Sequence, residues 1–328
     1  MQPTELPPRL IGLRKTTAHH LVTERDLSLF REKLAAPRGI ITLDIDGSLV
    51  DQATGLPTSD GLPGVIAKAR KAGYAVCLNS DRSVGSVRSM QQMLGTDEPN
   101  FLEAGAVVDF PSLKSQVLFD EQAVKTADTI EEMVRENLAI RLGERGMTDV
   151  EVKLLMGDDP IGSIGNWNNV RNAISPKRNK LVVGFRSKLT SMGFWVLDNA
   201  LSESPVANAE LANQVAAQLQ TYGELSGLKR PLHIAHNKSL TFHEPKTGFM
   251  TKDSMWRVLL NFLGEEERKG KNYFHIGDGV NDVIRDGRVK VLAVANAKDA
   301  LKAIASRTSD LSVTSGVIDS IEYILSSY

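Results

Sequence analysis

A short apolar segment that ends in two carboxylates restricts the folds open to this chain. Residues 39–43 form an apolar and β-branched run, and Asp44 and Asp46 follow it, with Gly47 directly after. Such a run is typical of a strand buried on both faces, as in a parallel sheet. In open α/β sheets, ligands collect at the carboxyl ends of the strands. We therefore expect Asp44 and Asp46 to lie at the mouth of a site.

The spacing of these two aspartates indicates a metal site, with one alternative. Side chains two residues apart in an extended chain point to the same face, and neighbouring carboxylates repel each other unless a cation or a shared proton intervenes. A divalent metal is the simplest answer. Aspartates at strand ends also serve as helix caps and turn formers, so partner residues farther along the chain must decide between the two interpretations.

A second strand end supplies a hydroxyl group. A helix predicted over residues 65–72 leads to a buried strand over 74–78, and this strand, helix, strand order is a right-handed βαβ unit. Ser80 follows the second strand. Its hydroxyl and the backbone amides after it can donate hydrogen bonds to a phosphate group at the carboxyl end of that strand.

The third predicted strand ends in another acidic segment. Residues 273–276 precede Asp278, Asn281 and Asp282, which adds oxygen ligands of the kind that Mg²⁺ takes together with water and phosphate oxygens. Lys252 stands at the start of the helix before this strand, a position at which the helix macrodipole disfavours a cation. A lysine in so unfavourable a place indicates a functional role.

The middle of the chain has a different pattern, which predicts an α+β insert between two parts of the first fold. The insert is expected to contain helices over 121–144 and 207–222, strands over 150–155, 181–185 and 194–197, a loop over 157–179, and a hairpin of 232–235 with 239–243. Beyond it we expect a helix over 253–263, a strand over 289–294, and helices over 298–306 and 317–325.

Composition and charge narrow the classes of function. A chain of 328 residues exceeds the usual single core, so two domains or a large insert are expected. The net charge of -1 gives no general attraction to nucleic acid or to an anionic membrane. The single cysteine, Cys77, indicates a reducing compartment. No segment approaches the roughly 20 apolar residues of a membrane span, and no signal peptide is recognisable. We therefore expect a soluble, cytoplasmic protein.

On these residues, the chain resembles the haloacid dehalogenase superfamily of phosphotransferases over nearly all of residues 39–328. Four motifs of that family are matched in its order by residues 44–48, Ser80, Lys252 and residues 277–282. Residues 103–108 are also similar to the segment that precedes the cap domain in the Cof-like branch. Lys246 is a rival for the third motif, but its turn-rich setting suits the loop before the motif, so we prefer Lys252.

The resemblance implies a fold and its domains. The expected fold is a doubly wound parallel α/β sheet, a Rossmann-like core, with an inserted α+β cap of the C2 type, as in sucrose-phosphatase and other sugar phosphatases. The expected parts are an N-terminal extension over 1–38, a catalytic core over 39–111 and 246–328, and a cap that determines substrate specificity over 112–245.

The family mechanism implies a role for each matched residue. Asp44 is expected to attack phosphorus and form an aspartyl-phosphate, and Asp46 to act as general acid and then as general base. Ser80 and Lys252 are expected to bind the nonbridging phosphate oxygens. The Mg²⁺ cofactor is expected to be held by Asp44, the carbonyl group of Asp46 and Asp278, with Asn281 and Asp282 orienting its water shell.

The function implied is that of a Mg²⁺-dependent phosphatase for a small soluble metabolite, most commonly a sugar phosphate. Two alternatives stay open: a phosphomutase of the phosphomannomutase kind, and a non-catalytic regulatory protein. One residue departs from the family pattern, because Asp81 stands where relatives usually have glycine in Thr-Gly-Arg. Its side chain can pair with Arg82, point away, or select a cationic group of the substrate. The sequence leaves the oligomeric state unknown.

Overall fold

The computed structural model describes nine stretches of the chain, which fall into two compact units. One unit takes in the described residues of 24–118 and 251–328, and the other those of 121–245. The described residues are 24–110, 115–118, 121–156, 179–186, 188–199, 206–227, 232–236, 240–245 and 251–328.

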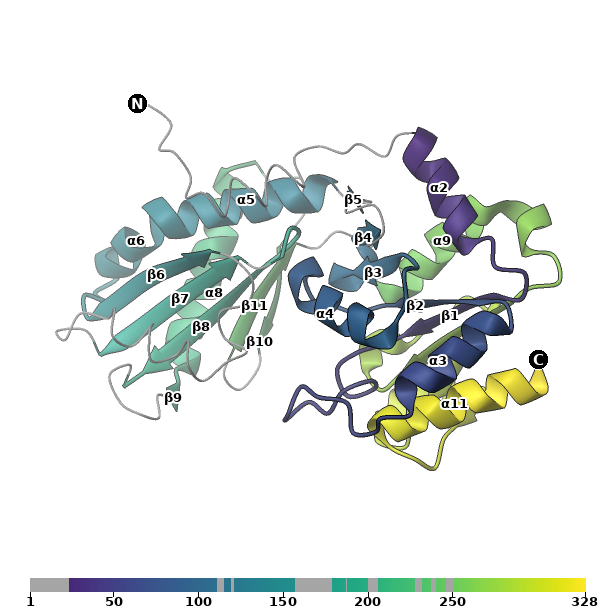
Figure 1. The fold of residues 1–328 in the computed structure, drawn as a ribbon. Helices are drawn as coiled ribbons and strands as arrows, with labels where there is room; N and C mark the ends of the chain where they lie inside the picture. The colour runs from purple at the N-terminus through teal and green to yellow at the C-terminus, as the bar shows by residue number, and fades with distance from the viewer. Residues whose placement is uncertain are drawn as a thin grey trace. The chain divides into compact units, whose positions relative to one another are not determined.

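The first unit is built on a five-stranded sheet whose strands are all parallel (Figure 1). Its order is β14-β13-β12-β1-β2. The strands are β1 (Gly39–Leu43), β2 (Tyr74–Leu78), β12 (Asn272–Gly277), β13 (Val289–Ala293) and β14 (Arg307–Thr308). Every residue of β1 and β2 is buried, as expected for a parallel sheet covered on both faces.

The register of the sheet brings the ends of three strands to one edge. Leu43 at the end of β1 lies opposite both Leu78 of β2 and Ile276 of β12. The residues that follow these strands therefore leave the sheet together. This alignment places the candidate site residues on the same edge, as the sequence predicts.

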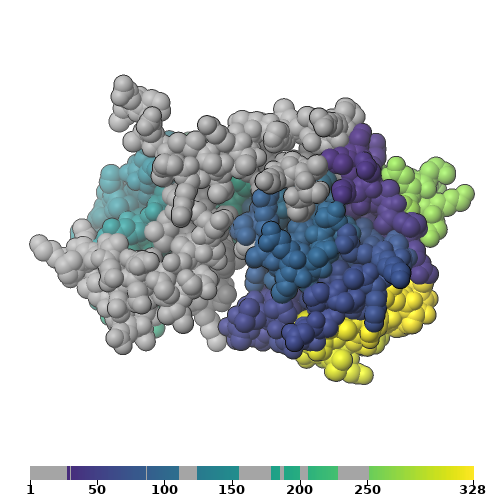
Figure 2. Space-filling model, viewed as in Figure 1, coloured from purple at the N-terminus to yellow at the C-terminus, as the bar shows by residue number. Residues whose placement is uncertain are grey.

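The core helices are α2 (Glu24–Leu34), α3 (Leu62–Lys71), α4 (Val84–Leu94), α9 (Lys252–Arg268), α10 (Asp299–Lys302) and α11 (Val313–Ser327). Helices α3 and α11 pack against each other on one side of the sheet, with α9 on the other (Figure 1). Figure 2 shows α3 and α11 side by side at the surface. The helix predicted over 298–306 is much shorter, because α10 ends at Lys302.

A small antiparallel sheet follows α4 and was not expected from the sequence. It consists of β3 (Asn100–Leu102), β4 (Val107–Phe110) and β5 (Ser115–Leu118), in that order. A single 3-10 turn, η1 (Glu103–Gly105), joins β3 to β4. Residues 103–108, the segment that is similar to the Cof-like branch, therefore form this turn and the start of β4.

The second unit is an α+β structure, as the pattern of its sequence predicts. Its antiparallel and parallel strands have the order β10-β11-β8-β7-β6, with β9 paired to β8. The strands are β6 (Val150–Met156), β7 (Lys180–Arg186), β8 (Met192–Asp198), β9 (Val206–Ala207), β10 (Leu232–His236) and β11 (Leu240–Pro245). The predicted hairpin is confirmed, because β10 and β11 pair antiparallel.

Among the described residues, three helices pack against this second sheet: α5 (Glu121–Glu136), α6 (Leu138–Glu144) and α8 (Ala209–Leu225). Their apolar side chains share one core with those of the strands, including Ile130, Phe194 and Leu219. The prediction of a single helix over 121–144 is wrong, since Asn137 separates α5 from α6. The loop predicted over 157–179 and the rival Lys246 lie outside the described residues, apart from Asn179.

Candidate active site

Three strand ends place polar side chains together at the edge of the core sheet. Asp44 follows β1, Ser80 lies two residues after β2, and Asp278 follows β12; all three side chains are buried. Backbone hydrogen bonds continue the sheet past its strands, because the amide of Asp44 donates to the carbonyl of Ile276 at 2.9 Å and the amide of Asn79 to that of Leu43 at 2.8 Å. The aspartate and serine side chains are therefore held by the sheet itself.

Lys252 brings a buried ammonium group to this edge from the start of α9. Thr251 caps the helix, with a reciprocal pair of hydrogen bonds to Ser254. The Lys252 side chain is fully buried and donates to one carboxylate oxygen of Asp44 and, at 2.6 Å, to Oδ1 of Asp282. These two carboxylates offset the unfavourable position of a cation at a helix N-terminus.

Asp282 is the most fully bonded carboxylate of the site. It ends the short 3-10 helix η2 (Val280–Asp282). Its Oδ2 accepts hydrogen bonds from the backbone amides of Asp278 at 3.1 Å and Gly279 at 2.8 Å. Its Oδ1 accepts from Lys252 and lies 2.9 Å from Nε2 of His275. Asp282 therefore holds the loop after β12 and the lysine at the same time.

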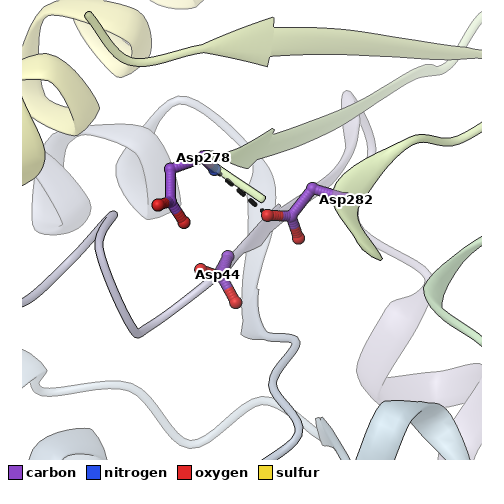
Figure 3. Close-up of side chains that lie close together, drawn as sticks. All are labelled: Asp44, Asp278 and Asp282. Atoms are coloured by element: carbon purple, nitrogen blue, oxygen red, sulfur yellow. Dashed lines mark hydrogen bonds between the residues drawn. The ribbon is translucent and has the colours of Figure 1, made fainter. Parts of the chain in front are cut away.

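The carboxylates of Asp44, Asp278 and Asp282 form a compact cluster. Each offers an oxygen within 4.8 Å of the others, and in Figure 3 the three groups turn toward a common centre, with a dashed line from the Asp278 amide to Asp282. Gly47 closes one side: its backbone is left-handed, and a Cβ there would collide with Oδ2 of Asp278. Ser48 donates to the other oxygen of Asp278 at 3.3 Å.

The donor chemistry of this cluster fits a hard divalent cation. Mg²⁺ takes oxygen ligands and is commonly bound by one or two carboxylates, with water and phosphate oxygens completing the shell. Three carboxylates face the single ammonium group of Lys252, which leaves an excess of buried negative charge. Because the four acceptor positions of Asp282 are already used, Asp44 and Asp278 are the carboxylates suited to a metal ion.

Burial and charge shift the pKa values in a consistent way. Burial, opposed by Lys252 and aided by Asp282, raises the pKa of Asp44 well above its ordinary value. Burial and the neighbouring Asp282 also raise the pKa of Asp278. For Asp282, burial is outweighed by Lys252 and His275, so its pKa is lowered. Burial would lower the pKa of Lys252, but Asp44 and Asp282 raise it, and the lysine is a cation.

Asp46 stands apart from the buried cluster and has a partner of its own. Arg82 donates from Nε to Oδ2 of Asp46 at 2.9 Å and from Nη2 to Oδ1 at 2.5 Å. The Asp46 side chain is 46% exposed, so water or a bound substrate can reach its carboxylate. This two-pronged pairing fixes the direction of the carboxylate.

Ser80 and Asn281, the two remaining residues that the sequence predicts for the site, both form hydrogen bonds. Ser80 is buried, and its hydroxyl accepts a hydrogen bond from the backbone amide of Arg82 at 3.2 Å. Asn281 is exposed and donates from its side chain to Oδ2 of Asp81 at 3.1 Å. Asp81 therefore bonds to Asn281, which lies 200 positions away in the chain, whereas Arg82, the partner considered for it, bonds to Asp46.

Sequence reasoning missed several residues that contact the site. Arg82 was considered only as part of a motif and as a partner for Asp81, although an arginine beside the second strand end is a natural partner for Asp46. Thr42 and His275 lie within β1 and β12, where their polarity in buried strands was the available signal.

One family model matches part of the chain. A family model described as haloacid dehalogenase-like hydrolase matches residues 41–144. No curated protein sequence matches the chain. Among the described residues, no helix is both long and apolar enough to cross a membrane.

Solved structures with the same fold cover most of the chain. A haloacid dehalogenase-like hydrolase from Bacteroides thetaiotaomicron is 15% identical, with a TM-score of 0.55 over 88% of this chain and 99% of the other. A trehalose-6-phosphate phosphatase from Aspergillus fumigatus is 14% identical, with a TM-score of 0.51 over 90% and 98%. A protein from Thermoplasma acidophilum is 19% identical, with a TM-score of 0.51 over 87% and 97%.

Proposed function

The chain belongs to the haloacid dehalogenase superfamily, and on that premise we propose that it is a Mg²⁺-dependent phosphatase that hydrolyses a small phosphorylated metabolite. The observation that carries the proposal is the buried contact between Lys252 and Asp44 at the shared edge of the strands. A buried carboxylate held beside an ammonium group, with a hydroxyl and backbone amides nearby, suits attack on a phosphate ester.

Asp44 is the proposed nucleophile. A carboxylate oxygen of Asp44 forms a bond to phosphorus while the bond from phosphorus to the ester oxygen breaks, which divides one difficult displacement into two easier ones. Water then attacks the aspartyl-phosphate, releases inorganic phosphate and restores the carboxylate. Lys252 supports this role because it holds Asp44 at the end of β1 and favours the ionised form of the carboxyl group.

Asp46 is the proposed acid and base. It donates a proton to the leaving ester oxygen in the first step and takes a proton from the attacking water in the second. Its exposure, in contrast to the burial of Asp44, suits a group that meets both the leaving group and water. Arg82 keeps its carboxylate in one orientation before substrate arrives.

Phosphate binding is assigned to Lys252 and Ser80. Lys252 uses two donors on Asp44 and Asp282, and its third N–H has no partner among the described residues. That donor and the hydroxyl of Ser80 are suited to nonbridging phosphate oxygens. These contacts are worth most where charge develops in the transition state, because Lys252 and Ser80 are both buried.

Mg²⁺ is the proposed cofactor, held by Asp44, Asp278 and the backbone carbonyl of Asp46. The support is the cluster of carboxylates and its excess of negative charge. When bound, the metal ion would neutralise charge on the phosphate. Asp282 and Asn281 are proposed to orient the loop that carries Asp278, through the hydrogen bonds already described.

A sugar phosphate is the proposed substrate class, and the unit of residues 121–245 the proposed cap that selects it. Support for the class comes from fold likeness to a trehalose-6-phosphate phosphatase and from the position of the insert within the chain. The likeness is one of fold, so substrate identity is a matter for assay.

A phosphatase screen tests the proposal. The purified chain is incubated with sugar, nucleotide and other metabolite phosphates, with Mg²⁺ or with EDTA, and free phosphate is measured. We expect Mg²⁺-dependent release that Asp44→Asn reduces to background. The matched control is Asp60→Asn, because Asp60 is exposed and is not a member of the carboxylate cluster.

Two results would contradict the proposal. Unchanged turnover in Asp44→Asn would refute the nucleophile, and an isomeric sugar phosphate as the product, without free phosphate, would show a phosphomutase instead.

A further inference from the structure

A threonine and a histidine lie where a parallel sheet ordinarily has apolar side chains. Thr42 of β1 and His275 of β12 are partners in the strand register, and both are fully buried. Their neighbours in the same strands include Ile41, Leu43 and Phe274. Burying an imidazole and a hydroxyl in this environment costs free energy unless both are hydrogen-bonded. A valine or phenylalanine would fill such positions without that requirement.

The two side chains form a line of hydrogen bonds that ends at the reaction centre. Oγ1 of Thr42 lies 2.7 Å from Nδ1 of His275, and Nε2 of His275 lies 2.9 Å from Oδ1 of Asp282. The same Oδ1 accepts from Lys252 at 2.6 Å, and Lys252 also donates to Asp44. Five consecutive groups thus connect the interior of the sheet to the proposed nucleophile.

The chemistry of these groups sets the direction of each hydrogen bond. An ionised carboxylate only accepts hydrogen bonds, so Nε2 of His275 must carry the proton that faces Asp282. Burial lowers the pKa of His275, which is therefore neutral, and its Nδ1 is an acceptor. The hydroxyl of Thr42 then donates to Nδ1 at 2.7 Å, which is much closer than its other acceptor, the carbonyl of Phe274 at 3.4 Å. One tautomer satisfies both contacts.

We propose that His275 is a positioning residue of the reaction centre: with Thr42 bonded to its Nδ1, it donates from Nε2 to Asp282 and so holds Lys252 against Asp44. This inference rests on the proposed function, because it assigns the lysine and Asp44 to the same reaction. His275 acts through Asp282 and does not itself touch substrate. Its hydrogen bond draws charge from Oδ1 of Asp282, so that the ammonium proton stays on Lys252.

A matched pair of amide substitutions tests the role of the Nε2 donor. In His275→Gln the amide group reaches the place of Nε2 and can donate to Asp282, whereas in His275→Asn it occupies the place of Nδ1 and falls short. We expect kcat of His275→Gln to stay within about twofold of the unaltered enzyme. We expect kcat of His275→Asn to fall by about tenfold, which corresponds to about 1.4 kcal/mol of activation free energy.

Thr42 supplies a second, independent pair. Thr42→Ser keeps the hydroxyl and should leave kcat unchanged, whereas Thr42→Val has the same shape without the donor and should lower kcat severalfold. Melting temperatures are measured for all four variants. Equal kcat in His275→Gln and His275→Asn, at similar melting temperatures, would overturn the proposal and leave His275 a packing residue.

Nuclear magnetic resonance of the full chain gives a readout that does not depend on turnover. Nitrogen-15 shifts of the histidine rings, with the His275 signals assigned by their loss in His275→Gln, should show the neutral Nε2–H tautomer. The opposite tautomer, or a charged ring at neutral pH, would overturn the proposal. If no phosphate ester is hydrolysed but the Nε2–H tautomer is found, the proposed function fails while the hydrogen-bonded line stands.

Discussion

Replacing Lys252 by methionine should destabilise the core unit strongly, because it leaves two carboxylates buried without their cation. The lysine side chain is fully buried, and the side chains of Asp44 and Asp282 are only 7% and 1% exposed. Each charge-assisted hydrogen bond contributes about 1.5–3 kcal/mol, and removal of one partner from a buried ion pair costs about 3–5 kcal/mol. We therefore expect Lys252→Met to lower the free energy of unfolding by about 3–5 kcal/mol at pH 7 in EDTA.

The pH dependence of this loss has a definite sign. Without the ammonium group, the folded-state pKa values of Asp44 and Asp282 rise, since Lys252 lowers both. An acid whose folded-state pKa is raised contributes stability below its ordinary pKa and loses it as the pH rises through the raised value. The deficit of Lys252→Met should therefore shrink as the pH falls from 7 toward about 4, near the ordinary aspartate pKa.

Urea unfolding, followed by circular dichroism and by tryptophan fluorescence, to which the buried Trp256 on α9 contributes, measures this loss. The matched control is Lys68→Met on α3, because Lys68 is exposed and the substitution should change stability by no more than about 0.5 kcal/mol. The double variant Lys252→Met with Asp282→Asn should recover part of the loss, since it removes one of the two uncompensated charges. A loss below about 1 kcal/mol in Lys252→Met would refute the buried ion pair.

Three further perturbations test neighbouring features. Gly47→Ala should weaken Mg²⁺ binding and lower stability, because the new Cβ collides with Asp278. The control Gly55→Ala, at a left-handed glycine with open space around it, should cost only about 1–2 kcal/mol of backbone strain. Equal Mg²⁺ affinities of the two variants by calorimetry would contradict the predicted collision at Gly47. Asp44→Asn should raise the free energy of unfolding at pH 7, since burial raises the pKa of Asp44 and makes its charge costly. In urea titrations this gain should vanish as the pH falls through the raised pKa toward about 3.9. A constant stability difference across that pH range would contradict the raised pKa of Asp44. Added Mg²⁺ should raise the melting temperature, by a stabilisation of about 2.7 kcal/mol at a hundredfold excess over Kd, and Asp278→Asn should abolish the shift; a shift retained in that variant would place the metal elsewhere.

The sequence predicts the core strands well because of how a parallel sheet is buried. Strands β1 and β2 have the predicted ends, and β12 extends the predicted 273–276 by one residue on each side. These strands are continuous apolar runs followed by polar turns, which is the strongest local signal. The small sheet of β3 and β4 gave no such signal, since its strands are three and four residues long.

Helix ends were harder to predict because apolar periodicity continues across breaks. The spacing of Ile130, Val134 and Leu138 fits one helix, yet all three pack into the same core from two helices that Asn137 separates. The start of α11 was predicted too late in the chain. This helix begins at Val313, four residues before the predicted start, since its first turn contains the buried residues Thr314 and Gly316 as well as apolar residues.

The members of the site could be predicted, but their pairing could not. Motif positions and strand ends indicated Asp44, Lys252 and Asp282 as residue types suited to phosphate chemistry. That Lys252 bonds to both aspartates depends on the distance between α9 and two strand ends, which no local pattern encodes. The same holds for Arg82 on Asp46, where two residues 36 positions apart meet.

The pairing of β1 with β12 has a consequence for the synthesis of the protein. Gly39 of β1 lies opposite Asn272, and the whole unit of residues 121–245 comes between them in the chain. At about 5–20 residues per second, β12 leaves the ribosome on the order of 10–50 seconds after β1. Throughout that interval one hydrogen-bonding edge of β1, all of whose residues are buried in the folded sheet, has no partner strand. The nascent chain therefore exposes a strand edge prone to aggregation, and a product truncated before residue 272 would keep it permanently.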